Sequence, residues 1–226
     1  MIKKFFDNIN LKSFIILFII YCFATVLCQF GIALFYTCSL GADPISIFVE
    51  GACLHINLTL GQFSTVCNVI LSILTIIFER RNAGFGLLIQ MAISGPLIDL
   101  FYPITMTWFP PETTTFILKI IILLFAILIY SFGLALTILC QLGIAPFSFP
   151  PLFLADITPI KLRYTQIITD AIWFIIGIIL GGTFGFGTII TVLLTGPCLG
   201  MFMKLCEKYI LKIGFAFKDQ KQYTGE

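Results

Sequence analysis

The sequence contains few charged residues: Asp, Glu, Lys and Arg together make up 11% of its 226 residues. Soluble domains contain roughly 25%, so this chain has too few polar side chains to cover a water-soluble globule. Hydrophobic residues make up 59% of the chain, and the mean hydropathy is +1.09. The composition therefore predicts a polytopic membrane protein with no separate soluble domain.

The sequence also lacks clustered metal ligands and the common catalytic motifs. His55 is its single histidine, and its eight cysteines are scattered without a CxxC pair, whereas a zinc site or a disulfide framework needs regularly spaced ligands. It contains no HExxH, GxSxG or Walker loop. We therefore expect no enzymatic activity, no metal site and no cofactor, and nothing in the charge pattern indicates a nucleic-acid partner.

Six runs are apolar and long enough to cross the hydrocarbon core, which takes about 20 residues of helix. The first run is too long for the apolar region of a signal peptide, so we expect it to stay as a helix. Two other apolar segments, 45–56 and 149–157, are too short to span and are either re-entrant or interfacial. The six predicted spans are Ser13–Thr37, Leu60–Phe78, Phe85–Ile104, Thr115–Cys140, Tyr164–Gly182 and Phe184–Met203.

The basic residues lie almost entirely on one side of the predicted membrane. With the N-terminus placed inside, twelve of the thirteen Lys and Arg residues fall inside, and only Lys119 falls outside. Because cytoplasmic loops carry an excess of Lys and Arg, this distribution predicts an even number of spans with both termini in the cytoplasm. Residues 204–226 would form a short basic tail. Lys204, Lys208 and Lys212 stand four residues apart on one helical face, which suits a helix that emerges onto an anionic lipid surface.

The chain contains an internal duplication. Phe30–Pro44 and Phe132–Pro146 share eight of fifteen residues at an offset of 102. Gly84–Phe101 and Gly185–Phe202 share seven of eighteen at an offset of 101. Chance would give about one identity in each comparison. Because the two blocks occur in the same order in both halves, the whole chain is predicted to be two copies of one unit.

Each repeat, about 13–104 and about 115–203, contains three predicted spans. An odd number of spans means that the second repeat enters the membrane from the opposite side. The predicted fold is therefore an all-α polytopic membrane protein whose six transmembrane helices form two inverted three-helix repeats within one transmembrane domain. Many secondary transporters have this architecture and bind their substrate near the midplane, between the repeats. A duplicated helix bundle without transport activity would show the same pattern, because symmetry establishes a fold and not a function.

Asp170 is the clearest charged residue inside a predicted span. A charge at the centre of a membrane helix costs about 2.5–3.5 kcal/mol on insertion scales, so it is retained with a partner or for a purpose. At the offset of 102 its equivalent is Asn68, and the two side chains would face each other near the midplane as a site for a cation, a proton or a hydrogen-bonding solute. The predicted binding residues are completed by Gln62, Gln166 and Arg163. A purely structural alternative is that Asp170 pairs with Arg163, seven residues away.

Local patterns predict several features around these residues. Asp43-Pro44 and Thr158-Pro159 each read as an N-cap followed by proline in the first helical turn, and the second pair would start the helix that carries Asp170. Asp99 lies near the outer end of its span, where we expect a solvated interfacial position. Glu50 is expected in a loop.

A Gly-Pro pair falls inside the third span of each repeat, at Gly95-Pro96 and Gly196-Pro197. Proline kinks a helix, and small residues let two helices approach closely. We expect these pairs to serve helix packing first, with a hinge or pore role as the alternative.

Several features stand out along the chain: the breaks Leu40–Pro44 and Leu142–Pro146, the Arg163…Asp170 pair, and the glycine run from Gly181 to Thr188 followed by Thr195-Gly196-Pro197. With these features the chain resembles the YczE/YyaS/YitT group of bacterial membrane proteins. The resemblance covers Ser13 to about Met203. It implies an integral membrane protein of the bacterial inner membrane without an established site, and transport is the activity that it suggests. The family position that matches Asp170 is commonly Glu.

The sequence thus favours a secondary transporter or facilitator of a small solute, with Asp170 as its binding or coupling acid. Two other interpretations stay open: a substrate-capture subunit that needs an energising partner, and a regulatory or scaffolding membrane protein without transport. The lipid bilayer is the expected surrounding, and a homodimer is compatible with the sequence. The solute, the coupling ion and the direction of transport are not encoded in any motif.

Overall fold

The computed structural model describes residues 11–80 and 82–213, and in this part of the chain every regular element is helical. Six helices are long and apolar enough to cross a membrane. This confirms the predicted all-α class and the six predicted spans. The six helices are α2 (Leu11–Cys38), α4 (Leu60–Phe78), α5 (Phe85–Trp108), α6 (Phe116–Cys140), α8 (Leu162–Ile179) and α9 (Phe186–Ile213).

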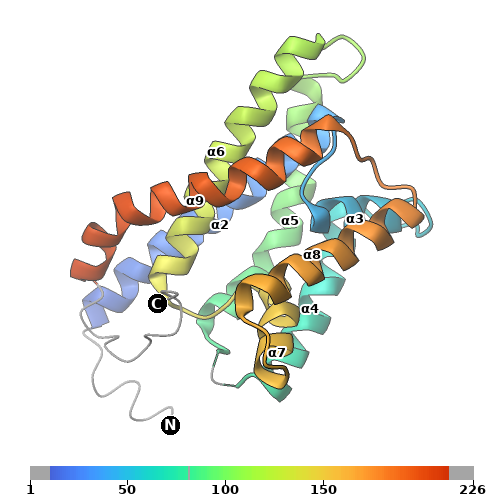
Figure 1. The fold of residues 1–226 in the computed structure, drawn as a ribbon. Coiled ribbons are helices and arrows are strands. Elements are labelled where there is room, and N and C mark those ends of the chain that lie inside the picture. Colours follow the sequence, from blue (N-terminus) through green and yellow to red (C-terminus); the bar gives the residue numbers. More distant parts are fainter. Residues whose placement is uncertain (1–10, 81, 214–226) are drawn as a thin grey trace.

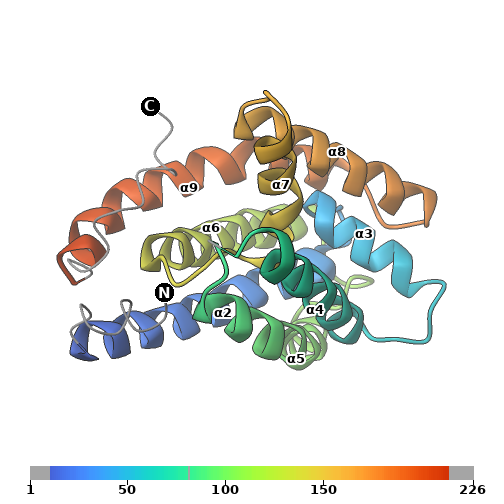
Figure 2. The ribbon, with the colours of Figure 1, turned by 90° about the horizontal axis from the view of Figure 1, so that it is seen from below.

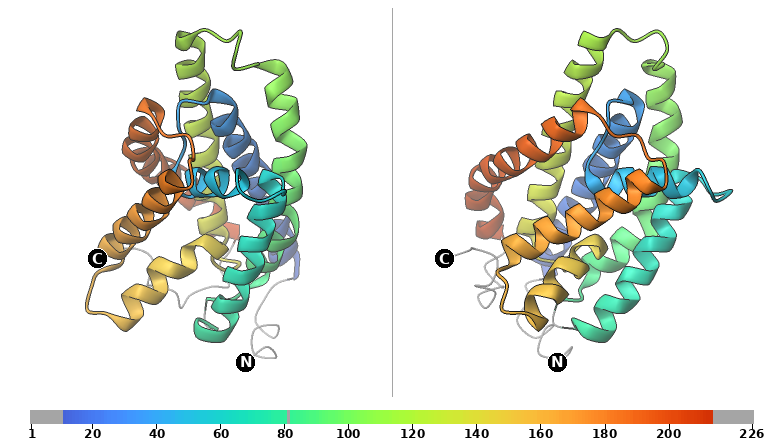
Figure 3. Two further views of the ribbon diagram at one scale, coloured as in Figure 1. Left: turned by 90° about the vertical axis from the view of Figure 1, so that its right-hand side faces the viewer. Right: turned by 45° about the vertical axis from the view of Figure 1, so that its right-hand side comes forward.

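Four of the long helices form a row in the order α5, α2, α6, α9, in which each helix packs against the next (Figure 2). Helix α4 packs against α5, and the short helix α3 (Pro44–Cys53) lies between α4 and α8 (Figure 3). The colours of Figure 1 show that α2 runs in the opposite direction to α6, as α5 does to α9. These two pairs of equivalent helices thus run in opposite directions, and the inverted relation of the whole repeats stays a prediction.

The core lies where α2 crosses α6. Leu34 and Phe35 of α2 pack with Leu123 and Ile127 of α6 in one apolar cluster, and a second cluster lies nearer the start of α2. Two glycines allow the close approach: a Cβ on Gly31 would lie 2.9 Å from the Tyr130 Cβ, and one on Gly133 would lie 2.8 Å from the Cys28 Sγ. We call two residues counterparts when they are 102 residues apart in the first two spans of each repeat, or 101 apart in the third; Cys28 and Tyr130 are counterparts, as are Gly31 and Gly133.

The turns after α2 and α6 show the same correspondence. Ser39 and Gln141 are counterparts and both adopt a left-handed conformation, with φ of 50° and 51°. The next residue in each turn accepts a hydrogen bond from the other half: Gly187 donates to the Leu40 carbonyl at 2.9 Å, and Gly86 donates to the Leu142 carbonyl at 2.8 Å. These matched contacts support the duplication predicted from the sequence.

The start of α8 differs from the prediction. Thr158 does not cap this helix: it ends the short helix α7 (Phe149–Ile157), and Lys161 is the N-cap of α8. The residue before a proline is pushed into an extended conformation, and Thr158 has ψ of 156° and bonds back to the Leu154 carbonyl. The Thr158-Pro159 pair therefore ends one helix instead of starting the next, although Asp170 still lies in the middle of α8.

The ends of two other helices also shift. Helix α8 ends at Ile179, before the predicted Gly182, because Gly181 takes a positive φ of 85° and the Gly182 N–H bonds to the Gly177 carbonyl, as in a glycine C-cap. Helix α9 continues through residues 204–213, which were predicted to begin the basic tail. The rest of that tail, 214–226, lies outside the described residues.

The two short apolar segments are helices. Segment 45–56 contains most of α3, and segment 149–157 is α7, which follows a single 3-10 turn, η1 (Pro146–Ser148). The predicted N-cap is confirmed, because the Asp43 side chain accepts from the Ser46 N–H. Helix α3 packs against α8 with Ile47 fully buried. Whether α3 and α7 are re-entrant or interfacial stays a prediction.

Candidate functional site

Asp170 is partly buried in the middle of α8. Its Oδ1 accepts a hydrogen bond of 3.0 Å from the Gln166 side-chain amide, one helical turn earlier. Gln166 is neutral, so this bond does not compensate the charge of the carboxylate. Arg163 is exposed, and within residues 11–80 and 82–213 it makes no ion pair with Asp170. Of the five predicted binding residues, the structure joins only these two, Asp170 and Gln166, by a hydrogen bond.

Aromatic rings and a second acid lie near Asp170. Trp173, three residues further along α8, packs against Phe48 of α3 with ring centroids 4.7 Å apart, and against Phe147 of η1 at 6.0 Å. Asp43, at the start of α3, is close enough to Asp170 to interact with it electrostatically. The carboxylate of Asp170 is therefore near the contact between its own half of the chain and α3 of the other half.

Asp43 is held by the first turn of the helix that it caps. Its Oδ1 accepts from the Ser46 hydroxyl at 2.5 Å and its Oδ2 from the Ser46 N–H at 3.3 Å. Burial raises the pKa of the Asp43 carboxyl above its ordinary value, and the bonds from Ser46 oppose this shift. Asp43 thus combines a structural role at the start of α3 with a carboxyl group within electrostatic range of Asp170.

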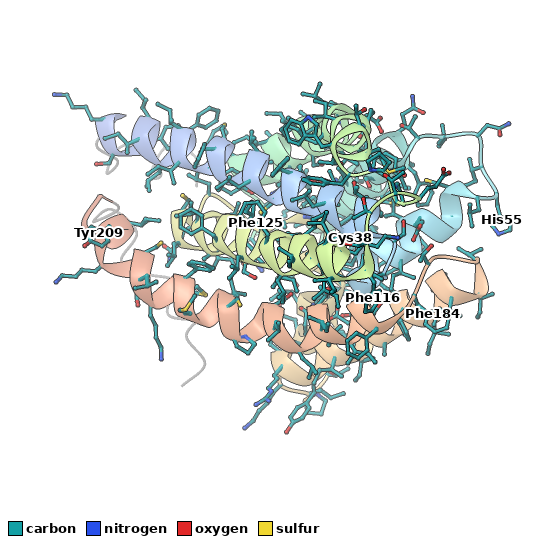
Figure 4. The ribbon with its side chains drawn as sticks, turned by 90° about the horizontal axis from the view of Figure 1, so that it is seen from above. Cys38, His55, Phe116, Phe125, Phe184 and Tyr209 are labelled. Carbon is teal, nitrogen blue, oxygen red and sulfur yellow. The ribbon has the colours of Figure 1, made fainter. Side chains whose placement is uncertain are left out.

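A set of polar contacts fastens α3 to the end of α8. The Glu50 carboxylate accepts from the Thr183 N–H and from the Thr183 hydroxyl, each at 2.9 Å. His55 Nε2 lies 3.0 Å from the Leu180 carbonyl oxygen. Figure 4 shows His55 and Phe184 at the same end of the molecule, in the connections that follow α3 and α8.

The two helices also approach closely, because a Cβ on Gly51 would meet the Gly177 carbonyl oxygen at 2.6 Å. Glu50 was expected in a loop, and its role here was missed. The spacing could have indicated it: Glu50 is seven positions after Asp43, which is two helical turns from the N-cap of α3. A narrow depression beside these contacts is lined by Tyr36, Glu50 and Thr183 among other residues, and it has no room for a solute in this conformation.

The first-half residues Asn68 and Gln62 serve helix packing and capping. Asn68 is 5% exposed and donates from Nδ2 to the Ser94 hydroxyl at 2.7 Å, which joins α4 to α5. Gln62 forms a capping box with Thr59 at the start of α4. No hydrogen bond joins Asn68 to Asp170 in the described part of the chain, since each bonds within its own half. Their predicted meeting across the two repeats stays a prediction.

Asp99 has a structural partner that the sequence did not indicate. Its carboxylate accepts from the Thr59 hydroxyl at 2.6 Å and from the Gly61 N–H at 2.9 Å. An acid at a helix N-terminus satisfies free N–H groups and complements the helix dipole. Asp99 therefore fastens the start of α4 to α5. Within the described residues, no group of three His, Cys, Asp or Glu side chains is placed to hold a metal ion.

One protein family matches nearly the whole chain. A family model described as "Family of unknown function (DUF6198)" matches residues 15–204, which include most or all of each of the six long helices. The chain belongs to this family. It is accordingly a multi-pass membrane protein with relatives whose names assign no activity. No solved structure matches it.

Three similar proteins are also named as uncharacterized. The uncharacterized protein YyaS of Bacillus subtilis (strain 168) is 26% identical over 181 residues, which cover 80% of this chain and 89% of YyaS. The uncharacterized membrane protein YczE of the same organism is 26% identical over 166 residues, 71% and 73% of the two chains. An uncharacterized protein of Haemophilus influenzae is 25% identical over 188 residues, 82% and 83% of the two chains. The resemblance to YczE and YyaS that the sequence predicted is confirmed.

Proposed function

We propose that this protein is a secondary transporter or facilitator that moves a small solute across the bacterial inner membrane, and that Asp170 binds the solute or the coupling cation. The protein would act as a carrier, not as an enzyme. The observation that carries the proposal is the uncompensated carboxylate in the middle of α8, a helix long and apolar enough to span the membrane.

The free-energy cost of this carboxylate supports a functional role. An ionised side chain at the bilayer centre costs about 2.5–3.5 kcal/mol on insertion scales, and such residues usually mark ion or substrate pathways. Gln166 offers Asp170 one hydrogen bond but no positive charge. Asp43 adds a second negative charge within electrostatic range. A proton, an inorganic cation or a cationic solute would compensate both acids.

The position of Asp170 between the halves of the chain also supports transport. In inverted-repeat transporters the binding site lies near the midplane where the repeats meet. Helix α8 belongs to the second half and packs on α3 of the first half. We propose that the two halves are inverted repeats in the membrane, with both termini in the cytoplasm. This arrangement would place Asp170 at the interface that such transporters use.

The test compares metabolites inside and outside cells that lack the gene, overexpress it, or carry a variant of it. We expect at least one small solute to change its distribution with the wild-type protein. Asp170→Asn should abolish this change, and Asp170→Glu should preserve it, because Glu keeps the charge. Lys161→Gln is the control, since Lys161 is an exposed cation at the start of the same helix, and it should behave as the wild type does.

Two results would count against the proposal. An unchanged solute distribution in both the deletion and the overexpressing cells would exclude transport of the solutes measured. Full activity of Asp170→Asn, at the same abundance in the membrane, would remove Asp170 from the mechanism.

A further inference from the structure

The two halves differ in how their second and third long helices pack. In the first half, α4 packs along α5. In the second half, the equivalent helices α8 and α9 are joined by an extended connection (Figure 1) and do not pack along each other, and α8 packs on α3 instead. As a result α9 is the least covered of the spanning helices: 6% of its most apolar stretch is buried, against 33% for α5. The contact between the second and third long helices is therefore formed, or closed, in the first half and absent, or open, in the second.

One of the hydrogen bonds that join α4 to α5 in the first half involves two residues whose equivalents in the second half are present but not bonded to each other. Asn68 donates to Ser94 between α4 and α5, and the counterparts of these residues are Asp170 and Thr195. The Thr195 hydroxyl is buried and has no partner in the described structure, whereas the Thr191 hydroxyl one turn earlier bonds to the Gly187 carbonyl. An unsatisfied buried hydroxyl has a free-energy cost. A bond from Thr195 to Asp170 would remove that cost.

The glycines of the third helices show the same contrast. A Cβ on Gly95 would overlap the Thr65 hydroxyl and the Gly61 carbonyl oxygen, so glycine is required where α5 meets α4. Its counterpart Gly196 has nothing within 4 Å of an added Cβ. Close helix contact is the common reason for glycine in membrane helices, yet in this conformation Gly196 makes no such contact.

The side chains that would meet at this contact are compatible in size. In the first half, the α4 residue is Gly61 and the α5 residue is Asp99. In the second half, their counterparts are Arg163 on α8 and Gly200 on α9, so the large and the small residue are exchanged between the helices. A Cβ on Gly200 also has nothing within 4 Å, which leaves room for the Arg163 side chain if α8 packs on α9.

From these contrasts we propose that α8 exchanges between two positions: on α3, where this structure holds it, and on α9, where it would repeat the α4–α5 contact with Thr195 donating to Asp170. The inference rests on the proposed function and supplies its moving part. Asp170 would lie near Asp43 and α3 in one position and against α9 in the other. The two positions would present the carboxylate to different surroundings, as alternating access requires.

Polar contacts, aromatic packing and a close glycine contact hold α8 in its present position. The polar contacts are the bonds from Thr183 to Glu50, the contact of His55 with the Leu180 carbonyl, and the 2.8 Å bond from the Thr165 hydroxyl to the Pro151 carbonyl of α7. Trp173 packs against Phe48, and Gly51 approaches Gly177 closely. Movement of α8 breaks few polar contacts, and the connection that follows it contains Gly181 and Gly182.

Disulfide trapping in native membranes tests the second position directly. Ile167 and Gly196 are the counterparts of Thr65 and Gly95, which touch in the first half. The double variant Ile167→Cys/Gly196→Cys should form a disulfide on oxidation, because its Cβ atoms would come within the roughly 4 Å that a disulfide needs. Peptide mapping identifies the linked positions and separates this bond from any bond to the native cysteines.

The control pair is Ile175→Cys/Leu193→Cys. Both residues are exposed, and their counterparts Ile73 and Ala92 are exposed as well although α4 and α5 pack together. The exchange therefore does not join them, and no link should form. A 167–196 link that is missing, or no more abundant than the 175–193 link, would overturn the proposal.

A second variant keeps the test decisive if the double-cysteine protein fails to fold. Gly196→Leu fits the open space of this structure but would block α8 from docking on α9, so the protein should keep its thermal stability and lose its Asp170-dependent solute movement. Leu193→Phe is the control on the same helix and should retain movement, because Leu193 is exposed and its counterpart Ala92 is exposed as well although α4 and α5 pack together. Retained movement in Gly196→Leu would overturn the exchange. If no solute is found at all, the proposed function fails, whereas the disulfide link still reports on the exchange.

Discussion

Cys28 contacts its own counterpart, Tyr130: the Cys28 Sγ donates to the Tyr130 carbonyl oxygen at 3.9 Å, and the two residues are 102 positions apart. A residue can touch its own counterpart only where the equivalent parts of the two repeats meet. The same crossing contains Gly31 against Tyr130 and Gly133 against Cys28. The α2–α6 contact is therefore the pivot about which the two halves are arranged.

Replacing Gly31 should weaken this crossing. Gly31→Leu forces a side chain against the Tyr130 backbone and Cβ, which lie 2.9–3.2 Å from an ideal Cβ. Overpacking of this kind costs about 1–3 kcal/mol, so the melting temperature in detergent should fall. Gly200→Leu, which enters open space, should leave it unchanged. Equal melting temperatures for Gly31→Leu and the wild type would mean that α2 and α6 do not cross this closely.

The start of α4 depends on the Thr59 hydroxyl, which accepts from the Gln62 N–H and donates to Asp99. Thr59→Val removes both bonds at nearly constant volume and should destabilise the protein by about 1 kcal/mol, the usual cost of losing an N-cap. Thr59→Ser keeps the hydroxyl and should restore most of the loss. The hydrogen-exchange rate of the Gln62 backbone amide measures this loss locally. It should rise in Thr59→Val and stay low in Thr59→Ser.

Asp43 should make the stability of the protein fall as the pH rises. Burial raises the pKa of this carboxyl above its ordinary value of 3.8, so its contribution is fully present below pH 3.8 and is lost as the pH rises through the folded-state pKa. Asp43→Asn keeps an effective N-cap and should flatten this part of the curve of melting temperature against pH. Asp43→Ala removes the cap and should melt lower at every pH. An unchanged slope in the Asn variant would contradict the pKa direction.

Glu79 and Asp156 should produce a second dependence of the same sign. Burial, together with the nearby Asp156 carboxyl, raises the pKa of Glu79, and the bond from the Asn82 amide opposes this shift. Stability should again fall as the pH rises through the raised pKa. Asp156→Asn should reduce the shift, and Glu79→Gln should remove the dependence, in a titration of melting temperature. An unchanged pH dependence in Asp156→Asn would mean that Asp156 is not the neighbour responsible.

The proposed orientation is open to a direct measurement. A reporter placed after Phe109 should lie outside the cytoplasm, and one at the C-terminus should lie inside, because α5 and α9 would end on opposite sides of the membrane. The two reporters should therefore give opposite signals in whole cells. The same signal from both would contradict the odd number of spans in each half.

The spans were the most predictable part of this fold, because length and hydropathy depend on local sequence alone. Leu60–Phe78 was predicted to the residue. The helix ends were less predictable where a local pattern fits two structures. Thr158-Pro159 can start a helix or end one, and Thr158 takes the extended conformation of a residue before proline, which ends α7. The extension of α9 past Met203 agrees with the spacing of Lys204, Lys208 and Lys212, which stand four residues apart, as on one face of a helix.

The candidate site was predictable only in part. Asp170 stands out because an acid inside an apolar run is visible in the sequence. The partners of Asn68, Asp99 and Glu50 were missed because they lie 26, 40 and 133 residues away, and no local pattern encodes a contact between distant helices. The repeat comparison did identify which positions of the two halves correspond. The Asn68–Ser94 bond then showed what the corresponding pair, Asp170 and Thr195, would form if α8 packed on α9.

The turns after α2 and α6 have a consequence for the origin of the chain. Each turn gives its free carbonyl, Leu40 or Leu142, to an N–H at the start of the third helix of the opposite half, Gly187 or Gly86. A single half would leave its own turn and its own helix start without these partners. On the inverted arrangement proposed above, an ancestor with one copy could complete its backbone only by pairing with a second molecule that had inserted the other way up in the same membrane.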